Sequence, residues 1–252
     1  MTPAPAHGRE IISVDVGDVR VVTASLHGRA IATLYHGDAY SIRPTLGFMD
    51  CDCLDPPYLI KTRGAGSFRK RRKSMDEIAE AGIDKGFDLS IINPLLAGAV
   101  VCFSHNDQLP ALLHQIDGQF DTFALLDWTK ANPMPVANKH YRPDREFYVH
   151  AWNKGYHPRG ELAEKSRSIT APSDRGLKER FGHPTIKPRA VMDKIMRNIA
   201  GKTVCDPFMG TGSTGVAAIK AGKHFFGIEH DARWFEAACE RIAETILESR
   251  LS

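Results

Sequence analysis

The stretch Thr203-Val204-Cys205-Asp206-Pro207-Phe208-Met209-Gly210-Thr211-Gly212-Ser213-Thr214-Gly215 decides how the rest of the sequence is interpreted. A short β-branched and apolar run, which predicts a strand, ends in Asp-Pro, and a glycine-rich turn follows it. Residues 216–221 then predict a helix that begins directly after the turn. Glycine permits positive φ and close approach of a ligand to the backbone, and the first turn of a helix presents free N–H groups. The stretch therefore predicts a ligand-binding loop between a strand and a helix.

A second predicted strand, 224–228, ends at Glu229, 19 residues after Gly210. The order strand, glycine loop, helix, strand and acid is typical of sites for adenosine-containing ligands, in which the acid binds ribose hydroxyls. A nicotinamide dinucleotide and S-adenosylmethionine fit this order equally well. The position of the loop near the C-terminal end, and the Asp-Pro before it, argue against a dehydrogenase.

The second notable motif is Asp55-Pro56-Pro57-Tyr58, which follows a predicted strand over 48–54. Open α/β sheets bind ligands at the carboxyl ends of their strands. Because the prolines restrict the backbone, the Asp55 carboxylate and the Pro56 carbonyl can both accept from one exocyclic amino group. The Tyr58 ring offers a flat face for a base. Taken alone, the tetrapeptide fits an ordinary turn with a partly buried tyrosine better.

Composition and charge describe an ordinary globular protein of 252 residues, 42% hydrophobic and 25% charged. The net charge is only +3, so affinity for nucleic acid must come from local clusters of cations. Five cysteines without a CxxC pair predict buried thiols in a reducing cytoplasm. The eleven histidines show no metal-binding spacing, and no apolar run reaches membrane-spanning length. We therefore expect a cytoplasmic protein with no metal and no membrane partner.

Residues 61–73 form the densest cationic segment and contain no acid. Such a run is by default a solvated loop, but beside a base-binding pocket it favours contact with DNA. The expected DNA-binding residues are Lys61, Arg63, Arg69, Lys70, Arg71, Arg72 and Lys73.

Strands and helices alternate along the chain, which predicts a doubly wound α/β fold with a mostly parallel sheet covered on both faces. Further strands are predicted over 11–26 (a hairpin turning at Gly17-Asp18), 30–35, 99–104, 122–129 and 146–152. Helices are predicted over 74–82, 87–96, 109–116 and 188–200, and a last helix after an Asp231 cap. We divide the chain into an extension (1–29), a catalytic half with a basic loop at 59–75 (30–152), a candidate target-recognition segment (153–182) and a cofactor half (183–252).

Seven short motifs follow one another in a fixed order. They are LYHGD at 34–38, LDPPY at 54–58, WTKANPMP at 128–135, REFYVHAW at 145–152, HPTIKP at 183–188, DPFMGTGSTG at 206–215 and GIEHD at 227–231. In this order the chain resembles the amino-group DNA methyltransferases of the β group, over about residues 30–247. The resemblance implies the S-adenosylmethionine-dependent methyltransferase fold in circularly permuted order, with a small target-recognition insertion. Ile186 stands where a polar residue is expected before Lys187.

The resemblance also implies roles for residues at matching positions. Asp55, Pro56, Pro57 and Tyr58 would hold the target base. The cofactor would be held by Asp38, Thr185, Lys187, Asp206, Phe208, Gly210, Thr211, Gly212, Ser213 and Glu229. Within this set, Asp206 and the glycine loop would face the methionine end, Glu229 the ribose and Asp38 the adenine.

The implied reaction is methylation of adenine N6 in double-stranded DNA after the base leaves the duplex. Cytosine-N4 methylation would use the same kind of pocket for the amino group. Asp rather than Ser before Pro-Pro-Tyr favours adenine. Methylation of an amino group in RNA or protein is a more distant alternative. An alternative from another functional class is a non-catalytic DNA-binding protein that senses S-adenosylmethionine. We expect a homodimer on a two-fold symmetric site; the sequence does not imply a partner nuclease.

Overall fold

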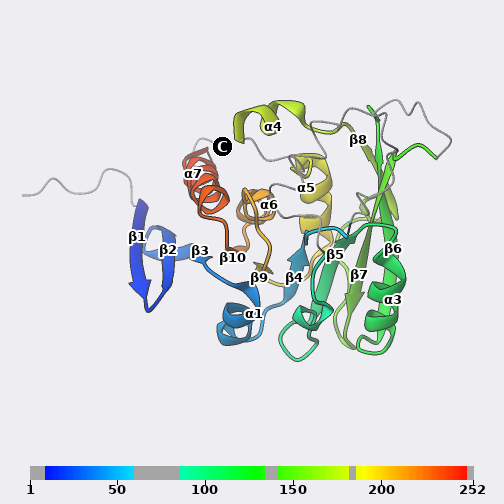
Figure 1. Ribbon diagram of the computed structural model, residues 1–252, viewed down its shortest axis with the longest axis horizontal. Coiled ribbons are helices and arrows are strands. Elements are labelled where there is room, and N and C mark those ends of the chain that lie inside the picture. Colours follow the sequence, from blue (N-terminus) through cyan, green and yellow to red (C-terminus); the bar gives the residue numbers. More distant parts are fainter. Residues whose placement is uncertain (1–8, 60–85, 134–140, 182–185, 249–252) are drawn as a thin grey trace, which may run out of the picture.

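A computed structural model describes residues 9–59, 86–133, 141–181 and 186–248. Within these ranges one sheet of ten strands runs through the molecule in the order β1-β2-β3-β10-β9-β4-β5-β7-β6-β8 (Figure 1). The strands are β1 (Arg9–Val16), β2 (Val19–Leu26), β3 (Arg29–His36), β4 (Cys51–Leu54), β5 (Ala99–Ser104), β6 (Thr122–Lys130), β7 (Arg145–Trp152), β8 (Ser168–Ala171), β9 (Thr203–Asp206) and β10 (His224–Glu229).

The centre of the sheet is parallel. Strands β3, β10, β9, β4 and β5 are parallel neighbours, whereas β7 is antiparallel to both β5 and β6. The last two strands in sequence, β9 and β10, therefore lie in the middle of the sheet, which is the permuted order expected from the sequence. Because β4 and β9 are parallel neighbours, the loops after Leu54 and after Asp206 leave the sheet at the same edge.

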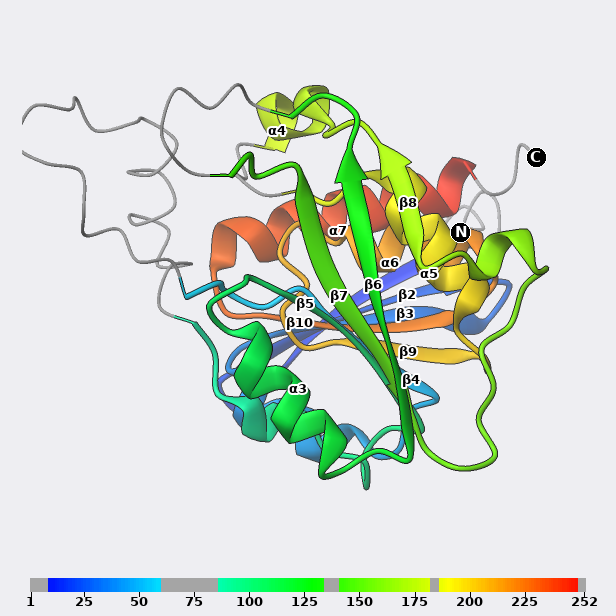
Figure 2. The same cartoon turned by 90° about the vertical axis from the view of Figure 1, so that its right-hand side faces the viewer.

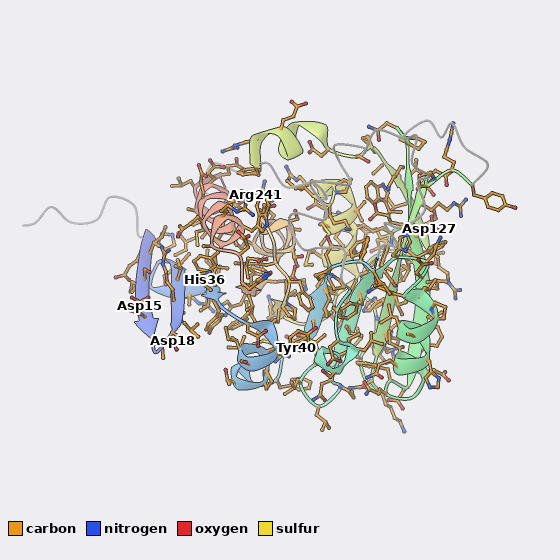
Figure 3. The ribbon with its side chains drawn as sticks, viewed as in Figure 1. Asp15, Asp18, His36, Tyr40, Asp127 and Arg241 are labelled. Carbon is orange, nitrogen blue, oxygen red and sulfur yellow. The ribbon has the colours of Figure 1, made fainter. Side chains whose placement is uncertain are left out.

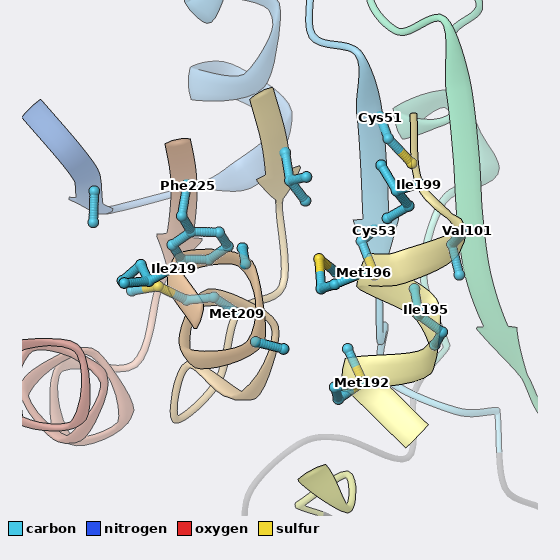
Figure 4. Packing of buried hydrophobic residues seen from close by; sticks show 14 of the residues in the cluster. Cys51, Cys53, Val101, Met192, Ile195, Met196, Ile199, Met209, Ile219 and Phe225 are labelled. Atoms are coloured by element: carbon cyan, nitrogen blue, oxygen red, sulfur yellow. The ribbon is translucent and has the colours of Figure 1, made fainter. Parts of the chain in front are cut away.

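Helices cover both faces of the sheet, as predicted (Figure 2). One face carries α5 (Arg189–Asn198), α6 (Ser213–Lys220) and α7 (Ala232–Glu248), and the other carries α1 (Ala39–Ile42), the 3-10 helices η1 (Arg43–Leu46) and η2 (Leu89–Ile91), and α3 (Leu109–Asp117). The remaining helices are η3 (Ala163–Lys165) and α4 (Arg175–Phe181). Figure 4 shows how Met192, Ile195 and Met196 of α5, and Ile199 directly after it, pack beside the strands. The doubly wound fold is thus confirmed.

A buried ion pair anchors β4 from behind the site. The Arg43 guanidinium is fully buried, and its Nε and Nη2 donate to both carboxylate oxygens of Asp52 at 2.9–3.1 Å. Its Nη1 and Nη2 also donate to the carbonyls of Gly47 and Leu96, at 2.9 and 2.7 Å. Four of the five N–H donors of Arg43 are thus hydrogen-bonded within the described residues, which offsets most of the cost of burying its charge.

Several predicted elements need correction or extension. The helix predicted over 87–96 is wrong: the structure has only the single turn η2 there, because Pro94 cannot continue a helix, and Leu95 is 83% exposed. The N-terminal hairpin is confirmed, but β2 also pairs with β3, so it extends the main sheet. The candidate recognition segment 153–182 contributes the edge strand β8, parallel to β6. The predicted helix 74–82 lies outside the described residues.

The cysteines agree with the expectation from composition. Four of the five cysteines are buried, the fifth is partly buried, and all are free thiols, as predicted. None of the helices in the described ranges is long and apolar enough to cross a bilayer.

Candidate active site

The candidate site lies at the carboxyl ends of β4, β9 and β10, where three loops meet. Asp55 follows β4, the glycine loop follows Asp206 at the end of β9, and Glu229 ends β10. This edge of a parallel sheet is where open α/β folds bind their ligands. The two motifs that the sequence separates by about 150 positions are therefore neighbours in space.

The glycine loop is held in shape by Glu229. Gly210 and Gly212 have φ of 51° and 80°, a left-handed conformation that favours glycine, and Gly212 caps the N-terminus of α6. One Glu229 oxygen accepts from the Gly210 N–H at 2.9 Å and the other from the Asp231 N–H at 2.8 Å. Oε1 also lies 3.2 Å from Nδ1 of His230. Each carboxylate oxygen has two lone pairs, so Oε2, which accepts from Gly210, keeps acceptor capacity for a ligand hydroxyl.

Asp206 is only 1% exposed, and its charge is satisfied by its own loop. Its carboxylate accepts from the Phe208 N–H at 3.0 Å and from the Thr214 hydroxyl at 2.5 Å. Burial nevertheless raises the pKa of Asp206 to about 7, and the nearby carboxylates Asp55 and Glu229 add to this rise. A cationic ligand next to Asp206 would therefore favour its ionised form.

The other end of the glycine loop faces aromatic side chains and a helix cap. The Phe208 ring lies 6.2 Å from that of Tyr40 and 5.9 Å from that of Phe87, both edge-on. The exposed Asp38 caps α1 by accepting from the backbone N–H and the hydroxyl of Ser41. Tyr40 belongs to the helix that Asp38 caps, so this contact brings α1 next to Phe208.

The loop is fixed from behind by Arg241 of α7, which the sequence interpretation missed. Its guanidinium donates to the Thr211 carbonyl at 2.7 Å and hydroxyl at 2.9 Å, and lies 3.4 Å from the Ser213 hydroxyl. It also lies 5.0 Å from the centre of the Phe181 ring of α4. Burial lowers the pKa of Arg241 to about 10. Figure 3 labels Arg241 on α7 and Tyr40 near α1.

Lys187 meets Asp55 directly. The Lys187 ammonium lies 2.6 and 2.7 Å from the two carboxylate oxygens of Asp55, and the Tyr58 hydroxyl lies 3.3 Å from one of them. The resemblance assigned Lys187 to the cofactor, whereas the structure places its charged end on the carboxylate expected to hold the target amine. Pro56 is buried and Pro57 is partly buried, so packing as well as the proline rings restricts the backbone between Asp55 and Tyr58.

Two residues outside the predicted site extend this pair. Glu146 of β7 lies 3.4 Å from the Lys187 ammonium and 2.8 Å from the Lys130 ammonium of β6. Burial raises the pKa of Asp55, against the opposing effect of Lys187. Burial acts on Glu146 in the same direction, but the two ammonium groups outweigh it and lower its pKa. Glu146 is the only acid in β7, and this was the signal that could have identified it.

Some predicted site residues lie outside the described part of the chain. These are Thr185 and the seven expected DNA-binding cations, Lys61, Arg63, Arg69, Lys70, Arg71, Arg72 and Lys73. Their roles remain predictions.

Comparison with known proteins connects this geometry to a family. A family model described as DNA methylase, for N6 and N4 methyltransferases, matches residues 50–240. Among curated proteins, the type II methyltransferase M2.LlaDCHI of Lactococcus lactis subsp. cremoris is 22% identical, over 88% of this chain and 93% of its own. M2.DpnII of Streptococcus pneumoniae is 23% identical over the same shares.

Solved structures share the fold. M1.HpyAVI in complex with SAM is 24% identical with a TM-score of 0.62, covering 84% of this chain and 99% of its own. The cytosine-N4-specific PvuII DNA methyltransferase is 12% identical with a TM-score of 0.59, covering 87% of this chain and 91% of its own. Because the family match spans the Asp55 loop, the glycine loop and Glu229 together, this chain belongs to the DNA methylase family that modifies the N6 and N4 amino groups of bases.

Proposed function

We propose that this DNA methyltransferase transfers the methyl group of its cofactor, S-adenosylmethionine, to the N6 amino group of adenine in double-stranded DNA. The observation that carries the proposal is the position of Asp55-Pro56-Pro57-Tyr58 beside the glycine loop, at the carboxyl ends of neighbouring parallel strands.

The charges and shape of the loop fit the cofactor. Glu229 has acceptor capacity left for ribose hydroxyls after binding two backbone N–H groups. The Asp206 carboxylate offers negative charge to a ligand that carries a sulfonium and an ammonium group. The bound cofactor supplies a methyl group made electrophilic by the sulfonium. The residues of this chain determine which nucleophile is placed next to that methyl group.

Asp55 and Pro56 would make the amino group nucleophilic. The lone pair of an aromatic amine is delocalised into the ring, so the amine is a weak nucleophile. When its two N–H bonds are accepted by a carboxylate and a carbonyl, the nitrogen moves toward tetrahedral geometry and its lone pair becomes available. Positioning and electrostatics then supply most of the rate acceleration. The ring of Tyr58 would stack on the base, which must leave the duplex to reach the pocket.

Adenine is favoured over cytosine by a single residue. The pocket motif begins with Asp55, where Ser would favour cytosine. The fold does not discriminate, since the cytosine-N4-specific PvuII enzyme shares it. We further propose that the basic run 61–73 contacts DNA phosphates and that two copies of the chain act on a two-fold symmetric site.

Expression in a host without DNA methylation tests the proposal, with nucleoside analysis and mapping of modified bases in the host genome. We expect N6-methyladenine in one sequence context. N4-methylcytosine in its place would refute adenine specificity. Binding of S-adenosylmethionine without any modified base would favour a non-catalytic sensor.

A further inference from the structure

We propose that Lys187 and Glu146 are positioning residues for Asp55: Lys187 holds the Asp55 carboxylate ionised and oriented, and Glu146 holds Lys187 in place. This inference rests on the proposed function, because it concerns how Asp55 receives the target amino group.

The position of Lys187 is specific. It is 4% exposed, and it reaches Asp55 from 132 residues further along the chain, from the segment that leads into α5. Its ammonium lies 5.2 Å from the centre of the Tyr58 ring and 4.8 Å from that of Phe103. Aromatic faces attract a cation, and here they also exclude water from it. A buried ammonium in such surroundings needs a carboxylate partner, and Asp55 supplies both oxygens.

The hydrogen bonds at Asp55 leave room for the amine. A carboxylate has about four lone-pair sites. Oδ1 accepts from Lys187 at 2.6 Å and from the Tyr58 hydroxyl at 3.3 Å. Among the described residues, Oδ2 accepts from Lys187 alone, at 2.7 Å. Oδ2 is therefore the oxygen that can accept a further N–H. Lys187 orients the carboxylate without occupying this position, so it can stay in place while the base is bound.

Glu146 completes the arrangement from the neighbouring strand. Its Oε2 is buried without a hydrogen-bond donor in the described part of the chain, and the Lys187 ammonium lies 3.4 Å away. Its Oε1 pairs with Lys130 at 2.8 Å. Two carboxylates and two ammonium groups thus alternate from Asp55 to Lys130, and removal of any one leaves a charge unbalanced.

The electrostatics give the two residues opposite effects on Asp55. Burial raises the pKa of Asp55, Lys187 lowers it, and Glu146 raises it. The ionisable groups that face Asp55 are Lys187, Glu146, Tyr58, Cys53, Cys102 and Asp206. An ionised Asp55 keeps Oδ2 as a strong acceptor for the N–H of the amine, whereas protonation weakens this acceptor. The titration of Asp55 therefore sets the acid limb of the pH–rate profile.

The test is single-turnover methyl transfer to duplex DNA by the full chain, measured from about pH 5 to 9 with S-adenosylmethionine saturating at every pH. Lys187→Met should move the acid limb to higher pH by about 1–3 units. Glu146→Gln should move it to lower pH, and Lys187→Arg should restore most of the wild-type profile. A purely structural role would lower the rate at every pH without opposite displacements.

Lys194→Met is the matched control. Lys194 is also 4% exposed and belongs to α5, but its ammonium donates to the neutral Asn198 side chain at 3.0 Å. This variant should keep the wild-type acid limb. Calorimetry separates the rival role: the Kd for S-adenosylmethionine should stay within about threefold in Lys187→Met.

Three results decide the inference. Unmoved acid limbs in Lys187→Met and Glu146→Gln, or displacements in the same direction, overturn it. A normal rate at saturating cofactor combined with a weakened Kd would make Lys187 a cofactor residue instead. If Lys187→Met does not fold, the displacement in Glu146→Gln and the profile of Lys187→Arg decide. A wild-type protein that methylates no DNA would contradict the proposed function itself.

Discussion

Replacing Glu229 by Gln should weaken cofactor binding strongly while leaving the fold intact. In the wild type each Glu229 oxygen accepts a backbone N–H, from Gly210 and from Asp231. The amide of glutamine keeps the volume but offers one acceptor, so its NH2 group would face one of these N–H donors. The variant therefore loses the shape of the glycine loop on one side and the negative charge toward the ribose.

The magnitude follows from the kind of bond that is lost. A hydrogen bond to a charged group contributes about 1.5–3 kcal/mol. Loss of one such bond to a ribose hydroxyl should raise the Kd for S-adenosylmethionine by about 10- to 150-fold. Isothermal titration calorimetry measures this directly. Glu236→Gln is the control, because Glu236 is exposed on α7 and pairs with Arg20.

A Kd within about threefold of the wild-type value would refute the role of Glu229. A stabilisation of the folded protein by NAD, in place of S-adenosylmethionine, would contradict the assignment of the whole loop. Thermal melting with each ligand checks this second point with the same protein samples.

Three other predictions concern stability, pH and DNA. Arg43→Met should destabilise the protein by about 3–5 kcal/mol in urea denaturation because Asp52 stays buried without its partner, and a further Asp52→Leu should recover part of this loss. Burial raises the pKa of Asp206 to about 7. The Kd for the cationic cofactor should therefore increase as the pH falls below that value, with proton release on binding seen by calorimetry in two buffers; a constant Kd would contradict it. Neutralising residues 69–73 should weaken binding to every DNA sequence. The slope of log K against log salt concentration should become shallower by roughly 0.9 per lost phosphate contact. An unchanged slope would show that these residues are solvated and do not contact DNA.

Much of the fold and of the site framework could be predicted from local pattern. The glycine loop, the strand before it and Glu229 are close together in sequence, and glycine at positive φ leaves a clear signal. The strands predicted from the sequence also include most strands of the sheet. The helix predicted over 87–96 failed because the apolar residues at helical spacing (Leu89, Ile92 and Leu96) cannot outweigh Pro94, which lies between the last two of them.

The charged contacts around Asp55 and behind the glycine loop could not be predicted in the same way. Lys187 meets Asp55 across 132 positions of sequence, and this distance closes only because β4 and β9 are neighbours in the sheet. Glu146 joins them from β7, and Arg241 reaches the glycine loop from the last helix. Local sequence periodicity cannot predict such contacts, since they depend on the order of the strands and on the direction of each side chain.

The central claim, that Asp55 holds the target amine, is tested most directly by methyl transfer in Asp55→Ala. The assay follows a radioactive methyl group from S-adenosylmethionine to duplex DNA, with calorimetry of cofactor binding on the same variant. We predict that transfer is lost while cofactor affinity is largely kept, because the proposed mechanism assigns the amine to Asp55 and the cofactor to the loop after β9. Transfer within about tenfold of the wild-type rate, which is about 1.4 kcal/mol of barrier, would contradict this account.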